Sequence, residues 1–199
     1  MGMNMTAHDA LPPLRIGEIV LRTGRYEAMK HWYRTVLRID PYYERTDAAA
    51  RPQRDASADS ACEDSARGIA WAAEVRLCFF RLILDHPYQQ VIAIFDTPGV
   101  TQPGANAAGL HHMQLRDPSH EVFARRYRCL RNSGIEPFRA MDHGPNSSLY
   151  YRDPDDNIVE IAVPNHASAD RYLEALASDE FKANPSGRPL DLAKLLVRC

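Results

Sequence analysis

The sequence has little that would mark a secreted, membrane-embedded or nucleic-acid-binding protein. Its longest apolar stretches, such as 91–95, are far too short to cross a bilayer, and the N-terminus has neither the basic start nor the apolar run of a secretory signal. A formal net charge of -2 gives no electrostatic reason for a nucleic-acid or anionic-membrane partner. The chain has four cysteines and no CxxC pair: Cys62, Cys78, Cys129 and Cys199. This pattern favours free thiols in a reducing compartment over a disulfide framework or a zinc site, so we expect a cytoplasmic protein.

What is present is ordinary for a globular protein of modest size. The chain has 199 residues, of which 45% are hydrophobic and 25% charged. This length suits one domain, or two small modules that share a core.

An internal repeat organises the chain. Residues 16–22 (IGEIVLR) resemble residues 110–116 (LHHMQLR), and each segment is typical of a short strand. A helical pattern follows each strand, and after each helix comes a matching strand start, at 39–42 (IDPY) and 135–138 (IEPF). In the second copy, Asp117-Pro118 predicts the start of the helix and Gly134 its end. The helices are predicted from apolar stripes at helical spacing: Met29, Trp32, Tyr33, Val36 and Leu37 in the first copy, and Phe123, Tyr127 and Leu130 in the second.

The remainder of each copy reads as strands separated by turn signals. Further strands are predicted at 70–73, 75–84 and 91–95, and a hairpin turn at 153–157 between strands 147–152 and 158–163. Residues 47–66 hold almost no large apolar group, which indicates an insertion outside the core. We therefore predict an α+β fold of two paired βαβββ modules that form an incomplete barrel around a metal cleft. The predicted parts are an N-terminal arm (1–13), a first module (14–100) with the insertion 47–66, a second module (101–165), and a C-terminal helix and arm (166–199).

The repeat also suggests a metal site. If two related modules pair face to face, Glu18 of the first copy faces the position of His112 in the second. Glu160 lies on the last predicted strand between two apolar residues, and a carboxylate buried there needs a partner. Two carboxylates and an imidazole are a reasonable ligand set for a divalent cation, and they leave positions open for water or a chelating substrate.

Several of these segments resemble the vicinal-oxygen-chelate superfamily, which includes glyoxalases, bleomycin resistance proteins and extradiol dioxygenases. The resemblance rests on Leu-Arg-Thr after the first strand, GLHHMQL at 109–115, HGPNSSLYYRDPDDNIVEI at 143–161 and FKANPSGRPLDLAKL at 181–195. It covers roughly residues 14–195 without the insertion. The strongest similarity is to single-domain extradiol dioxygenases of the catechol 2,3-dioxygenase and biphenyl-2,3-diol 1,2-dioxygenase type.

The resemblance implies a site and a chemistry. It implies that Glu18, His112 and Glu160 hold a divalent metal, with Fe(II) as the main expectation and Mn(II) or another divalent ion as alternatives. It further implies that His143 and Tyr150 bind substrate and handle protons. Tyr150 and Tyr151 alternate faces of their strand, and the family match selects Tyr150. The partners it implies are a small-molecule substrate and O2, with a possible homodimer.

Two residues depart from the family pattern. Glu18 stands where the family has histidine, which lowers the charge of a site with a divalent ion from about +1 to about zero and shifts preference toward oxygen-loving ions such as Mn(II) or Mg(II). Asp156 stands where the family's turn has glycine, and Asp tolerates a left-handed backbone better than most residues do.

Four of the predicted site residues could instead have no functional role. His112 could be an ordinary strand histidine, Glu160 an edge-strand charge, Glu18 a surface carboxylate and His143 a solvated loop residue. His111 is expected to face away from His112 and to be structural. The remaining histidines are expected to be structural or exposed: His8, His31, His86, His120 and His166.

The sequence leaves three functional hypotheses. The first is a metal-dependent extradiol-type oxidoreductase that cleaves the ring of a small catechol or a related substrate with vicinal oxygens. The second is a metal-dependent lyase, isomerase or epimerase of the same superfamily. The third is a non-catalytic protein that sequesters a small planar molecule and needs no metal.

Overall fold

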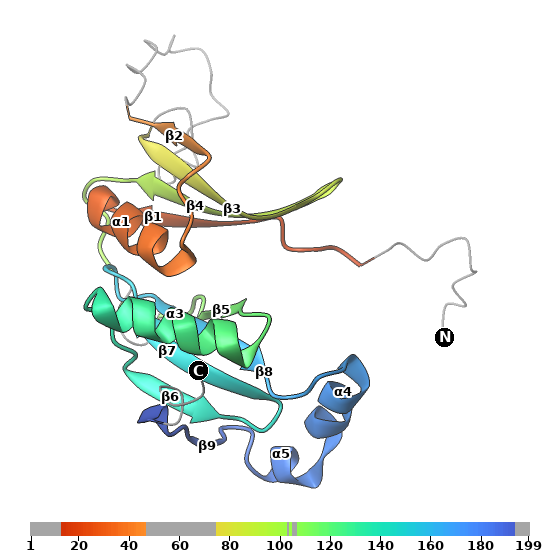
Figure 1. Ribbon diagram of the computed structural model, residues 1–199. Helices are drawn as coiled ribbons and strands as arrows, with labels where there is room; N and C mark the ends of the chain where they lie inside the picture. The colour runs from red at the N-terminus through yellow and green to blue at the C-terminus, as the bar shows by residue number, and fades with distance from the viewer. Residues whose placement is uncertain (1–12, 47–74, 103, 105–106, 194–199) are drawn as a thin grey trace. The chain divides into compact units, whose positions relative to one another are not determined.

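The computed structural model describes residues 13–46, 75–102, 104 and 107–193 (Figure 1). The predictions for the arm 1–12, the insertion 47–66, the strand 70–73, Cys62 and Cys199 lie outside these residues. No helix in the described ranges is long and apolar enough to cross a membrane.

The described chain divides into two compact units. One contains the residues up to Arg22 together with Asp40–Thr97, and the other contains Thr23–Ile39 and everything from Pro98 onward. We refer to them as unit 1 and unit 2 and describe each by itself.

Unit 1 is built on a four-stranded sheet in the order β1-β4-β3-β2. The antiparallel hairpin of β3 and β4 is its longest part, with Leu77 opposite Phe95. Its turn falls at 86–87, between the predicted strands 75–84 and 91–95. The strands are β1 (Glu18–Thr23), β2 (Tyr43–Arg45), β3 (Leu77–Asp85) and β4 (Tyr88–Asp96).

Unit 2 is built on a five-stranded sheet in the order β5-β8-β7-β6-β9. Here β5 pairs with β8 in parallel, whereas β7 is antiparallel to both β8 and β6. The strands are β5 (Met113–Arg116), β6 (Arg139–Asp142), β7 (Asn146–Arg152), β8 (Ile158–Pro164) and β9 (Arg188–Pro189). The helices of this unit are α1 (Tyr26–Leu37), α3 (His120–Asn132), α4 (Ala169–Ala177) and α5 (Asp179–Ala183).

The two sheets confirm the internal repeat and the α+β class. In each, the first strand of the copy lies beside the last, followed by the third and then the second. Neither sheet closes on itself within the described ranges. The turn at 153–157 is also confirmed, and Asp156 adopts the left-handed conformation there with φ 68°.

The helices bury the predicted apolar stripes. Met29, Tyr33 and Val36 of α1 are fully buried, as are Phe123 and Leu130 of α3. The start of α3 differs from the prediction, because its N-cap is Ser119, whose side chain accepts a hydrogen bond from the Val122 amide. Asp117 instead continues the strand, since its amide donates to the Ala162 carbonyl. The stop at Gly134 is confirmed by its positive φ of 75°.

Helix α1 packs within unit 2, although it precedes the strands of the second copy by many residues. The Tyr33 hydroxyl donates to Asp153 at 3.0 Å, and Nη1 of Arg126 on α3 donates to the Val36 carbonyl at 2.8 Å. These bonds tie the first helix of the repeat to the second sheet and its helix. The module boundaries 14–100 and 101–165 stay predictions.

Candidate functional site

The parallel pairing of β5 and β8 brings His112 and Glu160 together. Gln114 lies directly opposite Glu160, and His112 lies two residues earlier, just before β5 begins. The His112 Nε2 atom is 3.0 Å from Glu160 Oε2, and the Gln114 side-chain amide donates to Glu160 Oε1, also at 3.0 Å. Glu160 is only 3% exposed, so these neighbours compensate a buried carboxylate.

Tyr150 joins this pair from the neighbouring strand. The register of β7 and β8 places it directly opposite Glu160, on the same face of the sheet. Its ring centroid is 6.1 Å from that of His112. Burial, and after it the negative charge of Glu160, raises the pKa of Tyr150 to about 12, so the phenol stays protonated at neutral pH. Tyr151 points the other way and is buried in the core.

His143 completes the cluster from the turn between β6 and β7. The turn is closed by the His143 amide, which donates to the Asn146 carbonyl at 2.8 Å. The imidazole Nε2 lies 2.9 Å from the Tyr150 hydroxyl, and Nδ1 lies 3.1 Å from the Pro185 carbonyl oxygen. Four of the predicted site residues therefore form one continuous set in unit 2: His112, Glu160, Tyr150 and His143.

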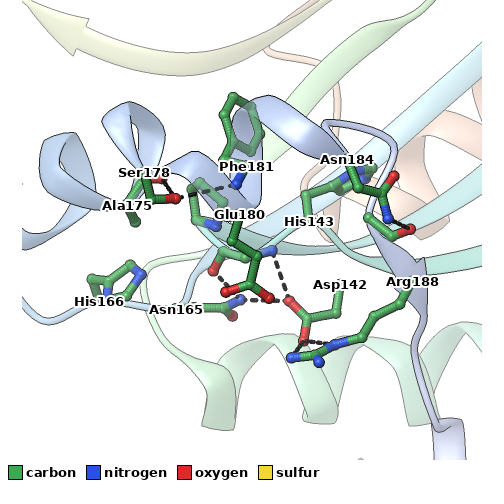
Figure 2. A pocket seen from close by; sticks show the side chains of 13 residues that line it. Asp142, His143, Asn165, His166, Ala175, Ser178, Glu180, Phe181, Asn184 and Arg188 are labelled. Atoms are coloured by element: carbon green, nitrogen blue, oxygen red, sulfur yellow. Dashed lines mark hydrogen bonds and ion pairs between the residues drawn. The ribbon is translucent and has the colours of Figure 1, made fainter.

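A cavity of about 350 Å³ lies beside His143 in unit 2 (Figure 2). Its walls come from the turn after β6, from the segment after β8 and from α5, and they include Asn165, Glu180 and Phe181. At its edge Asp142 accepts a hydrogen bond from Asn165 at 3.1 Å and lies 3.5 Å from Arg188. The imidazole that contacts Tyr150 thus also borders a space that a small molecule or water could enter.

His111 differs from the expectation that it faces away from His112. Its Nδ1 atom is 2.7 Å from Nδ1 of His112, and the two rings meet edge to face. Both residues precede the first residue of β5, Met113, so the alternation of side chains along a strand does not apply to them.

Glu18 does not belong to unit 2, because it begins β1 in unit 1. Its side chain is exposed. Among the residues that the structure describes, no group of three or more His, Cys, Asp and Glu side chains is arranged to hold a metal ion. The participation of Glu18 beside His112 and Glu160 stays a prediction.

The His112–Glu160 pair nevertheless fits two ligands of one divalent cation. Ligand atoms at about 2.1 Å from an ion and at right angles to each other are about 3.0 Å apart, which matches the 3.0 Å between His112 Nε2 and Glu160 Oε2. Imidazole nitrogen with carboxylate oxygen suits Fe(II), Mn(II) and similar ions. Further ligands would have to come from outside this pair.

Sequence reasoning missed two contributors to the site. Gln114 was accessible to it, because it is the polar residue between Met113 and Leu115 on the predicted strand, and alternation places it on the opposite face from these two apolar neighbours. The Pro185 carbonyl could not be predicted, because every residue has a backbone oxygen and the residue type does not show which one contacts the site.

Comparisons with known proteins identify the family of the chain. Residues 15–161 match the family described as the Glyoxalase/Bleomycin resistance protein/Dioxygenase superfamily. The chain is 30% identical over 178 residues to biphenyl-2,3-diol 1,2-dioxygenase 2 of Rhodococcus globerulus, covering 89% of this chain and 77% of that protein. It is also 30% identical over 185 residues to biphenyl-2,3-diol 1,2-dioxygenase 3 of the same organism, covering 90% and 80%.

Among solved structures, the fold resembles a glyoxalase/dioxygenase from Nostoc punctiforme. The TM-score is 0.51 at 16% sequence identity, with 81% of this chain and 100% of that chain covered. On the family match and the two relatives, the chain belongs to the Glyoxalase/Bleomycin resistance protein/Dioxygenase superfamily.

Proposed function

We propose that this protein is a metal-dependent extradiol-type dioxygenase that cleaves the ring of a small catechol or a related substrate with two adjacent oxygens. The observation that carries the proposal is the continuous set in unit 2, in which His112 Nε2 is 3.0 Å from Glu160 and His143 Nε2 is 2.9 Å from the Tyr150 hydroxyl. It joins two metal-ligand types to two proton-handling groups. The two dioxygenases at 30% identity support the same chemistry.

Each residue has a defined part in this proposal. His112 and Glu160, with Glu18 as the predicted third ligand, would hold Fe(II) or Mn(II). A divalent ion held there would act as a Lewis acid and stabilise negative charge on the substrate oxygens. His143 takes a proton from the substrate hydroxyl, because a neutral imidazole near pH 7 can accept and return protons. Tyr150, which is protonated at neutral pH, donates a hydrogen bond to a substrate oxygen.

The chemistry is tested by reconstituting metal-free protein with Fe(II) or Mn(II) without oxygen, then adding a panel of catechols and air. We expect yellow ring-cleaved products, with one O2 consumed per substrate. Metal-loaded protein that forms no product from any catechol of the panel would refute the proposal.

The strand β7 offers a matched pair of variants. Tyr150→Phe should lower kcat about 100-fold, because it removes a hydroxyl that contacts His143. Tyr151→Phe removes the same atom from the next residue, whose hydroxyl is buried without a hydrogen-bond partner in the described structure. This control should keep wild-type activity. Equal losses in the two variants would assign the effect of Tyr150 to packing.

A non-catalytic binding protein is the second candidate, and one contact favours it. The 3.0 Å between His112 Nε2 and Glu160 Oε2 is also the length of a direct hydrogen bond, in which the two side chains satisfy each other. If this reading is correct, metal-free protein binds a planar aromatic compound stoichiometrically and turns none of it over. Elemental analysis of protein purified without chelator separates the two candidates, since only the dioxygenase requires a bound ion.

A further inference from the structure

The two ring nitrogens of His143 have partners of different kinds. Nδ1 lies 3.1 Å from the carbonyl oxygen of Pro185, and Nε2 lies 2.9 Å from the hydroxyl of Tyr150. A carbonyl oxygen can only accept a hydrogen bond, whereas a hydroxyl can donate or accept. The contact with Pro185 therefore requires a proton on Nδ1 in both the neutral and the charged imidazole.

This requirement decides which nitrogen exchanges protons. With Nδ1–H retained, the neutral ring presents a lone pair on Nε2 that accepts from the Tyr150 hydroxyl, and the charged ring donates from Nε2 to the same oxygen. Tyr150 in turn stands opposite Glu160. The nitrogen that gains and loses a proton is thus the one that faces the candidate site.

The Pro185 carbonyl belongs to a segment that is hydrogen-bonded to β6. Strand β9 pairs with β6, with Asp142 opposite Arg188, and the Leu190 amide donates to the Ala140 carbonyl at 3.1 Å. Within the segment, the Asn184 side chain donates to the Gly187 carbonyl at 2.8 Å. We call residues 184–190 the C-terminal arm.

Gly187 shows how closely the arm approaches the turn that carries His143. A Cβ atom on Gly187 would lie 2.3 Å from the Asp142 carbonyl oxygen and 2.8 Å from the His143 Cα atom, and the residue has φ +72°. Any side chain at this position would push the arm away from residues 142–143. Glycine is therefore what allows Pro185 to reach the imidazole.

We propose that the C-terminal arm is a positioning element, in which the Pro185 carbonyl fixes the Nδ1–H tautomer of His143 and leaves Nε2 as its proton-exchanging atom. The inference rests on the proposed function for the role of His143 in catalysis, but the tautomer itself is a property of the protein without metal or substrate. Hydrogen-bond partners that orient metal-ligating imidazoles are typically worth about 10- to 100-fold in activity, and we expect an effect of this size at His143.

The test compares Gly187→Ala with Gly134→Ala in the full-length, metal-free protein. Gly134 also has a positive φ, +75°, but a Cβ there meets nothing within 4 Å, so this variant reproduces the backbone strain without displacing the arm. Nitrogen-15 NMR of the imidazole rings gives the tautomer directly, and the His143 signals are assigned among the eight histidines by their loss in His143→Gln.

We expect His143 to be the Nδ1–H tautomer in the wild type and in Gly134→Ala, and to shift toward Nε2–H in Gly187→Ala. In the reconstituted enzyme, Gly187→Ala should lower kcat about 10- to 100-fold with little change in KM. If Gly187→Ala fails to fold, Asn184→Ala, which only loosens the arm, should move the tautomer in the same direction.

Two outcomes would overturn the inference: an Nε2–H tautomer in the wild type, or an Nδ1–H tautomer that persists when the arm is displaced. Neither depends on ring cleavage. A wild-type protein with the expected tautomer and no activity on any catechol would instead refute the proposed function and leave the positioning role in place.

Discussion

A single buried carboxylate, Asp153, organises the turn that precedes β8 and the candidate ligand Glu160. It accepts hydrogen bonds from the Asp155 and Asn157 amides, from the Asn157 side chain and from the Tyr33 hydroxyl, at distances of 2.9 to 3.0 Å. Burial raises the pKa of Asp153, and these hydrogen bonds offset the effect only in part. Keeping Asp153 ionised in this buried turn therefore costs free energy.

The pKa shift predicts a specific pH dependence of stability. Because folded Asp153 binds its proton more tightly than the unfolded chain does, its contribution is present at low pH and is lost as pH rises from about 3.9 through the folded pKa. Asp153→Asn should flatten this part of the profile and, by disturbing the hydrogen bonds, lower the unfolding free energy by about 1–3 kcal/mol at pH 7. Urea unfolding over a pH series measures both effects.

The control for Asp153 is another carboxylate of the same turn. Asp156→Asn removes a carboxylate from an exposed side chain and should leave the hydrogen bonds of the Asp153 side chain intact. An Asp153→Asn profile that runs parallel to the wild type would show that this carboxyl does not titrate with a raised pKa.

At the scale of helices and strands, the repeated pattern was enough to predict most of the fold. The predicted stripe on α1, the hairpin turn before β8 and the matching strands follow from local periodicity, which sequence shows directly. Tyr150 is opposite Glu160 because both hairpin strands are regular, so alternation sufficed. Alternation failed at His111, which lies outside the strand. The cap signal at Asp117 was wrong because this residue continues the pairing of β5 with β8, and its carboxylate binds Arg126.

Arg126 of α3 connects two elements that the sequence did not relate. It forms a bidentate pair with the carboxylate of Asp117, which is only 2% exposed, and donates to the Val36 carbonyl at the end of α1. Arg126→Met should lower the unfolding free energy by about 3–5 kcal/mol, because it leaves Asp117 buried without a counter-charge. Denaturant unfolding of the purified variant measures this loss.

Two further variants show whether the loss comes from the buried charge. Arg131→Met on the same helix breaks only a half-exposed pair with Glu136 and should cost less than about 1 kcal/mol. Adding Asp117→Asn to Arg126→Met should recover part of the stability, because the unpaired charge is gone. A double variant no more stable than Arg126→Met would assign the loss to the contact with α1.

For the whole molecule, the sequence predicts a metal site whose ligands come from both units. His112 and Glu160 come together through β5 and β8 of unit 2, whereas Glu18 belongs to β1 of unit 1. Only the repeat, in which Glu18 corresponds to His112, connects them. Local patterns determine strands and helices, but a ligand set drawn from two units depends on how the units associate, and no residue pattern specifies that directly.

Metal-dependent stability tests this relation in the intact chain. An ion that binds only the folded protein adds about 2.7 kcal/mol at 100 times its Kd, which corresponds to a rise in Tm of roughly 5–10 °C for a chain of this size. We expect Mn(II) to raise the Tm of the wild type by this amount, and to have little effect on His112→Ala or Glu18→Ala. Glu18→His should again show a rise in Tm and shift the metal preference toward Fe(II), because imidazole replaces a hard carboxylate.

Glu121→Ala, which changes an exposed glutamate of α3, is the control and should respond like the wild type. A full response in Glu18→Ala would exclude Glu18 as a ligand and confine the metal site to unit 2.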